Sequence, residues 1–219
     1  MRLVVIILLF PFWLCSAQAQ YHDFGARTGL SADKKLTKYL SLSANMQMRL
    51  EENYSKIGSG LLDFQIGYKL NKKVSFGFSY RFSQKNDFRT SWETRHRAQL
   101  RLVLKKKIKP VTLQYRTIYQ VGFSGLYKPE NYYSPNTYWR NKVQFKLDID
   151  KKIEPYLASE VFYNVSNNFG VDGYRIAVGL NWDLPNKMEM KTGYMFQQEL
   201  YQVNPVTEHI FVLGYSFSL

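Results

Sequence analysis

Residues 73–82, KVSFGFSYRF, place an apolar side chain at every second position. Successive side chains of a β-strand point to opposite faces, so this segment predicts a strand with one apolar and one polar face. The same alternation recurs along the chain, and ten such strands can be counted between Tyr39 and Leu219. So many two-faced strands in one chain predict a sheet that closes into a barrel.

The segment Asp23–Ala32 shows a weaker alternation and raises the count to eleven. Bacterial membrane barrels usually have an even number of strands. The expected fold is therefore all-β, a transmembrane antiparallel up-and-down β-barrel of about ten strands, with ten to twelve possible. The first segment is interpreted as an edge strand, a plug or part of a twelve-strand closure.

The N-terminus has the three parts of a secretory signal peptide. Met1-Arg2 is a basic start, Leu3–Leu14 is an apolar core, and Ala17-Gln18-Ala19 is a cleavage box. The expected domains are a signal peptide at 1–19 and a barrel at 20–219. The alternative, an uncleaved anchor, is short for a membrane span. The single cysteine, Cys15, lies in the signal peptide, so the mature chain has no disulfide and no thiolate metal ligand.

The net charge of +13 raises the question of a nucleic-acid partner. Lysine and arginine are spread singly over alternating positions instead of forming one patch, which argues against nucleic-acid binding. Anionic lipid head groups or anionic solutes suit this charge better. No segment of the mature chain approaches the ~20 apolar residues of a membrane-spanning helix.

Alternation alone does not separate a membrane barrel from a soluble periplasmic ligand-binding barrel, which would turn the apolar face inward. The strands are about ten to thirteen residues long, enough to cross a bilayer when tilted. Tight turns alternate with loops of roughly eight to fifteen residues, as in outer-membrane barrels. Glycines lie mostly on the polar face, where a narrow interior needs space: Gly67, Gly77, Gly122, Gly179, Gly193 and Gly214.

The final strand carries Tyr215, Phe217 and a terminal apolar residue, Leu219. This ending resembles the C-terminal insertion signal of outer-membrane proteins, with Leu219 in place of the usual phenylalanine. The expected location is the outer membrane, with the C-terminus in the periplasm. The expected partners are outer-membrane lipid and lipopolysaccharide, and the barrel-assembly machinery during insertion.

The polar faces of the strands define a candidate lumen. The expected basic lining is Arg49, Arg81, Arg95, Arg97, Arg101, Arg116, Arg140, Lys142 and Arg175, and the expected acidic partners are Asp63, Asp148, Glu160, Asp183 and Glu189. One interpretation is a rigid network of arginine with carboxylate that fills a small barrel. The other is a narrow passage or pocket for small polar or anionic solutes, because unpaired cations favour anions.

An outer-membrane lipid hydrolase or acyl-modifying enzyme is the enzymatic alternative, and it needs a histidine paired with a nucleophile. The three histidines are His22 beside the cleavage site, His96 on the lipid side and His209 at a strand end. No nucleophile elbow, zinc-protease motif or phosphate loop is present, so no catalytic residue, metal or cofactor is expected. Five aromatic residues near the longest loop suit an aromatic girdle or an external binding surface: Tyr127, Tyr132, Tyr133, Tyr138 and Trp139.

Several segments of the strands and turns are distinctive: Arg49 with Glu51–Asn53, GYKLNKKVSFGFSYRF from Gly67, RHRAQL from Arg95, Tyr115-Arg116, and GYMFQQ from Gly193. In these segments the chain resembles an uncharacterised family of Gram-negative outer-membrane β-barrels, classed as a domain of unknown function. The resemblance covers most of the mature chain. It implies a barrel fold and an outer-membrane location and no activity. The sequence indicates neither a particular solute nor an oligomeric state.

Overall fold

The structure is a computed structural model of the 219-residue chain. It describes residues 21–87, 91–124, 136–149, 152–166, 170–200 and 205–219. The expected signal peptide with Cys15, and the loop tyrosines Tyr127, Tyr132 and Tyr133, lie outside the described residues.

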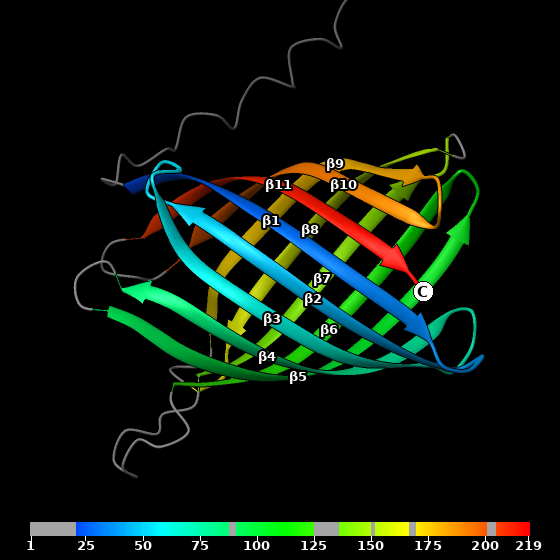
Figure 1. Ribbon diagram of the computed structural model, residues 1–219, viewed down its shortest axis with the longest axis horizontal. Coiled ribbons are helices and arrows are strands. Elements are labelled where there is room, and N and C mark those ends of the chain that lie inside the picture. The colour runs from blue at the N-terminus through cyan, green and yellow to red at the C-terminus, as the bar shows by residue number, and fades with distance from the viewer. Residues whose placement is uncertain (1–20, 88–90, 125–135, 150–151, 167–169, 201–204) are drawn as a thin grey trace, which may run out of the picture.

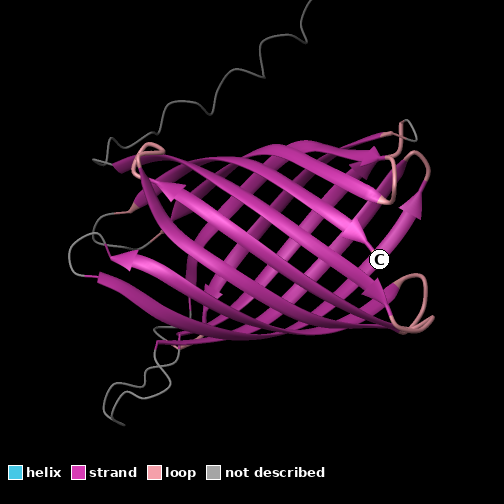
Figure 2. Cartoon of the chain, viewed as in Figure 1, coloured by secondary structure: helices cyan, strands magenta, loops and turns pink. Residues whose placement is uncertain are grey.

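The described residues form strands joined by turns and loops (Figure 2). The strands are β1 Tyr21–Lys35, β2 Leu40–Glu51, β3 Lys56–Lys69, β4 Val74–Asp87, β5 Ser91–Ile108, β6 Val111–Ser124, β7 Asn136–Leu147, β8 Ile153–Asn164, β9 Gly170–Leu184, β10 Met188–Glu199 and β11 Val206–Ser218. The segment quoted first lies in and just before β4. No helix among the described residues is long and apolar enough to cross a membrane.

The eleven strands close into a barrel in which each strand pairs with its neighbours in sequence, and β1 meets β11 (Figure 1). Strand directions alternate around the ring, and an odd number cannot alternate all the way. One neighbour pair must therefore be parallel. That pair is β1 with β11, from Tyr21 opposite Val206 to Asp33 opposite Ser218, and we call it the seam.

The expected all-β barrel is confirmed, and the first segment is a full member of the ring. β1 pairs with β2 on one side and β11 on the other, so it is neither a plug nor an unpaired edge strand. Unpaired strand edges are not tolerated in hydrocarbon, because their backbone groups find no water there. The closing pair removes both edges with eleven strands, without a twelfth.

The alternation places apolar side chains outside the barrel and polar ones inside. Leu100 is 60% exposed, and Phe76 and Phe145 are about half exposed. By contrast, Gln99, Gln120 and Gln144 are buried inside it. This arrangement excludes the alternative of a soluble barrel with an apolar interior. Two outward aromatic side chains have hydrogen-bond partners for their polar atoms. Trp139 Nε1 donates to Thr117 Oγ1 at 2.7 Å, and the Tyr115 hydroxyl donates to Asn141 Oδ1 at 2.7 Å.

The barrel has two rims. The C-terminal rim is formed by the ends of β1, β3, β5, β7, β9 and β11, with Leu219 after β11, and by the starts of the even-numbered strands. The opposite rim is formed by the starts of the odd-numbered strands, Tyr21 among them, and by the ends of the even-numbered strands. The expected contrast in loop length is only partly present. Segment 83–93, which the alternation of connection lengths predicts to be one of the long loops, is mostly strand, because β4 and β5 stay paired as far as Asp87 with Ser91.

Two inward glycines make room for an aromatic ring. A Cβ at Gly179 would lie 2.6 Å from the Tyr156 hydroxyl oxygen, and one at Gly193 would lie 2.5 Å from it. The sequence predicted that these glycines leave space in a narrow interior, and at this position the large neighbour is Tyr156. The Lys191 ammonium lies 4.6 Å from the centre of the same ring.

The outward face offers a direct test of the membrane orientation. Leu100→Arg, midway along β5, is expected to lower the free energy of unfolding by about 2–4 kcal/mol, the cost of a cation at the bilayer midplane. Leu104→Arg, on the same face nearer the C-terminal rim, is expected to cost only about 0–1 kcal/mol. Urea unfolding of the barrel in lipid vesicles measures both values. Equal losses would contradict a hydrocarbon belt centred near Leu100.

Candidate functional site

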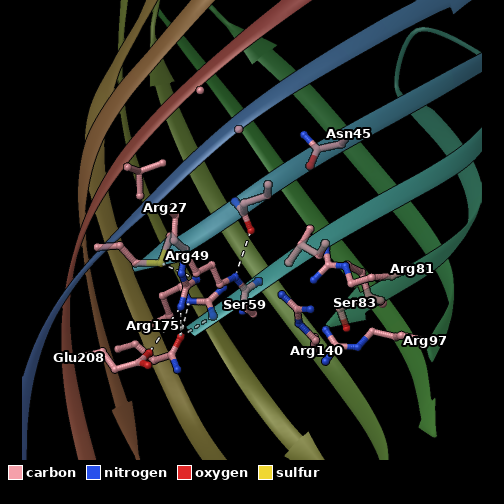
Figure 3. A pocket seen from close by; sticks show the side chains of 18 of the residues that line it. Arg27, Asn45, Arg49, Ser59, Arg81, Ser83, Arg97, Arg140, Arg175 and Glu208 are labelled. Carbon is pink, nitrogen blue, oxygen red and sulfur yellow. Dashed lines mark hydrogen bonds and ion pairs between the residues drawn. The ribbon is translucent and has the colours of Figure 1, made fainter. Parts of the chain in front are cut away.

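The barrel encloses a cavity of about 710 Å³. Among the described residues that line it, eleven side chains are basic and five are acidic, so its surface has a surplus of positive charge. Figure 3 shows guanidinium groups converging on this space, Arg27, Arg49 and Arg175 from β1, β2 and β9, and Arg81, Arg97 and Arg140 from β4, β5 and β7. This size is within the range of small-molecule sites.

Glu160 on β8 is the centre of the largest ion-pair network. Its side chain is only 4% exposed, and it accepts Arg140 Nη2 at 2.8 Å, Arg116 Nη2 at 3.3 Å and Arg175 Nη1 at 3.4 Å. The guanidinium groups of Arg140 and Arg175 also each lie 4.9 Å from the centre of the Phe162 ring. A buried carboxylate is stable only when paired in this way. The network holds three strands, β6, β7 and β9, to β8.

Asp63 and Arg81 form a second pair across β3 and β4. They are direct register partners, and Arg81 Nε donates to Asp63 Oδ1 at 2.8 Å while its Nη2 binds Oδ2. Such a two-point contact fixes the plane of the guanidinium group. Neither Asp63 nor Glu160 lines the cavity, whereas their arginine partners do. The cavity wall therefore presents the cations and hides these two acids.

A third group lies near the seam. Arg27 Nη2 lies 3.5 Å from Glu208 Oε2 and 3.4 Å from Gln197 Oε1, and Arg175 Nε donates to the same glutamine oxygen at 3.1 Å. Arg49 Nε donates to Gln47 Oε1 at 3.2 Å. Glu208 and Gln197 were not among the expected site residues. For Glu208 the available signal is strand alternation back from Ile210, which places it on the inward face of β11.

Arg97 and Arg101 on β5 differ from the other cavity arginines. Among the described residues, neither has a hydrogen-bond or ion-pair partner. Arg101 Nε and Arg116 Nε are also buried without a hydrogen bond. Buried polar atoms normally have partners, and an unsatisfied one is a candidate for binding a ligand or water. The guanidinium groups of Arg97 and Arg101 therefore form the part of the cavity wall that has no carboxylate partner among the described residues.

The remaining expected basic residues have different surroundings. Arg95 lines the cavity at the opposite rim, where its Nη2 lies 2.7 Å from Glu93 Oε2 and its side chain is half exposed. Lys142 on β7 lies beside Arg116 and Glu160 in the strand register but does not line the cavity.

Two of the expected acidic partners are not in the lumen. Asp148 follows β7 at the C-terminal rim, where its carboxylate binds the Lys107 ammonium in solvent. The hydrogen bond and charge of Lys107 lower the pKa of Asp148. Asp183 is exposed near the end of β9. Glu189 lines the cavity near that rim but is exposed. The alternating pattern of the sequence continues beyond the part of the strands that encloses the lumen. Asp148 and Asp183 are therefore corrected to rim residues.

The aromatic pair Tyr138 and Trp139 divides between the two faces. The Tyr138 hydroxyl donates to Asp172 Oδ2 at 2.9 Å and lines the cavity, whereas Trp139 is outward and 45% exposed. Of these two residues, Trp139 is the one that suits the aromatic girdle. His96 is outward, as expected from its strand position, and its Nδ1 lies 2.6 Å from the Tyr80 hydroxyl.

In the part of the chain that the structure describes, no group of three or more histidine, cysteine, aspartate or glutamate residues could hold a metal ion.

Comparison with known proteins supports the architecture. No curated protein matches this sequence. A solved structure of the NanC porin in a rhombohedral crystal form matches with a TM-score of 0.51 and 12% sequence identity, over 80% of this chain and 85% of that chain. At this identity the likeness shows a shared fold, a porin-like β-barrel. The family model described as protein of unknown function (DUF2490) matches residues 24–206, from β1 to the first residue of β11, and the chain therefore belongs to the DUF2490 family.

Proposed function

We propose that this protein is a narrow outer-membrane passage for small anionic solutes. The observation that carries the proposal is the cationic cavity, in which Arg97 and Arg101 have no carboxylate partner among the described residues. Fixed cations along a narrow water-filled path lower the energy of an anion and raise that of a cation. The porin-like fold is consistent with this role.

The passage is expected to admit only small solutes. The Glu160 network and Tyr156 fill part of the interior, which leaves a cavity of about 710 Å³. Because the arginines around Glu160 and Asp63 are held by ion pairs, they present a fixed charge pattern. Preorganised charges bind a counter-ion without a further cost of rearrangement. The passage is therefore expected to select solutes by both their charge and their size.

The membrane location is part of the same proposal. The exposed apolar belt and the closed strand ring suit an outer membrane, with the C-terminal rim in the periplasm. Phe217 on β11 and Leu219 directly after it are exposed, which suits the proposal that they form, with Tyr215, an insertion signal for the barrel-assembly machinery.

The C-terminal rim is rich in exposed lysine, which suits anionic lipid head groups as partners. These lysines are Lys34, Lys35, Lys38, Lys69, Lys72, Lys73, Lys105, Lys106, Lys107, Lys109, Lys152 and Lys187.

The proposal is tested by planar-bilayer recording of the barrel extracted from membranes. In a KCl gradient, single-channel steps are expected with a zero-current potential of the sign that marks preference for chloride. A cation preference would contradict the proposal. Silence would instead favour the second candidate, a rigid scaffold, for which the Glu160 network is the supporting observation. Turnover of lipid or ester substrates would favour the hydrolase alternative.

A further inference from the structure

The seam brings together two of the three histidines of the chain. His22 on β1 and His209 on β11 are 187 residues apart in sequence, and His22 Nδ1 lies 3.3 Å from His209 Nε2. The parallel register pairs Phe24 with His209, so His22 lies two residues away on the same outward face. The two ring planes are inclined by only 23°. The two imidazoles thus bring a nitrogen of each ring face to face at the opposite rim.

The separation of these nitrogens suits a shared metal ion. Zinc holds imidazole nitrogens at about 2.0–2.1 Å, so two nitrogens on one tetrahedral ion lie roughly 3.3 Å apart. Without a metal, the same distance is bridged by one hydrogen bond between the rings. The spacing of the two nitrogens is therefore already that of two ligands on one ion, which replaces the hydrogen bond when the rings turn about their side-chain bonds.

The surroundings of His209 hold its ring in the orientation that a ligand needs. The Tyr194 hydroxyl lies 2.6 Å from His209 Nδ1, the nitrogen that faces away from His22. The Phe24 ring stacks on the imidazole at 4.7 Å between centres, and the Phe196 ring meets it edge-on at 5.6 Å. Metal-binding histidines typically use the second nitrogen for such a bond, which fixes the tautomer and the ring plane.

His96 provides an internal comparison. Its Nδ1 also lies 2.6 Å from a tyrosine hydroxyl, that of Tyr80, and it is packed against Phe82 and Phe123. The chain has only three histidines, and the other two meet at the seam. His96 therefore has a tyrosine hydroxyl and aromatic packing like those around His209, but it has no second imidazole beside it. The His96 side chain is also buried.

We propose that His22 and His209 form a binding site for a first-row divalent ion such as Zn²⁺, Ni²⁺ or Cu²⁺. Imidazole suits these ions, whereas Mg²⁺ and Ca²⁺ take oxygen ligands. Two imidazoles supply half of a tetrahedral shell, and water fills the rest at this exposed rim. The ion links the first strand of the barrel to the last, so it stabilises the closed ring at the seam. This site does not depend on the proposed passage.

The test uses the full chain expressed without a polyhistidine tag, extracted from membranes into a neutral detergent, with Co²⁺ as the probe. Electron–nuclear double resonance is expected to show one high-spin Co²⁺ ion per chain with coupling to two imidazole nitrogens. Coupling to one nitrogen, oxygen-only coordination or no bound ion would overturn the proposal, and none of these outcomes needs a variant.

The variants assign the site. His22→Gln and His209→Gln are each expected to weaken Zn²⁺ binding in calorimetry by at least about tenfold, since even outer-shell partners of a metal contribute that much. His96→Gln is the matched control and is expected to bind as the wild type does. Zn²⁺ is also expected to raise the unfolding temperature of the wild type and not that of His22→Gln. Unchanged binding in His22→Gln, or equal loss in His96→Gln, contradicts the site.

Discussion

Replacing both unpaired cavity arginines by glutamate, Arg97→Glu with Arg101→Glu, is expected to change the barrel from anion-selective to cation-selective. Each substitution changes the charge of the wall by two, and both lie on β5 facing the cavity. Because no carboxylate among the described residues is bound to either arginine, the change breaks no ion pair. The zero-current potential in a KCl gradient is expected to reverse its sign.

Lys106→Glu is the matched control for this reversal. Lys106 is on the same strand but is exposed at the C-terminal rim, where mobile ions screen its charge. It is expected to shift the potential without changing its sign. Heat-dependent electrophoretic mobility shows that each variant is folded. If the double variant kept the wild-type sign, the paired arginines would be setting the selectivity instead.

Glu160→Gln is expected to lower the free energy of unfolding by about 3–5 kcal/mol, the usual cost of removing one partner from a buried ion pair. The amide keeps the shape of the side chain and removes its charge, so Arg116, Arg140 and Arg175 lose their common counter-ion. Urea unfolding of the barrel in lipid vesicles measures the loss. In the folded fraction, the uncompensated cations are expected to strengthen the preference for anions.

Glu93→Gln is the same substitution at an exposed pair. Glu93 binds Arg95 at the opposite rim, where the two side chains are 34% and 48% exposed, so the expected loss is no more than about 1 kcal/mol. A similar loss in both variants would mean that Glu160 is not the centre of the interior network. A large loss confined to Glu160→Gln supports a network that holds β6, β7 and β9 to β8.

Alternation along the strands was sufficient to predict which residues face outward and which face the interior. Leu100 is exposed on the outer face and its neighbour Arg101 lines the cavity, because side chains in a strand change face at every residue. The same rule failed where strands end. Asp148 and Asp183 obey the alternation but lie at the C-terminal rim, since a strand end cannot be located from alternation alone.

The sequence by itself determined the fold class and the two faces of each strand, because these follow from a two-residue period that is local. Only the tertiary structure decided how the ring closes, which carboxylates bind which arginines, and which arginines stay free. Three arginines from three strands meet Glu160, and His22 meets His209, through strand register. Register depends on pairing between distant segments, above all the parallel seam of β1 with β11, and no local pattern encodes it.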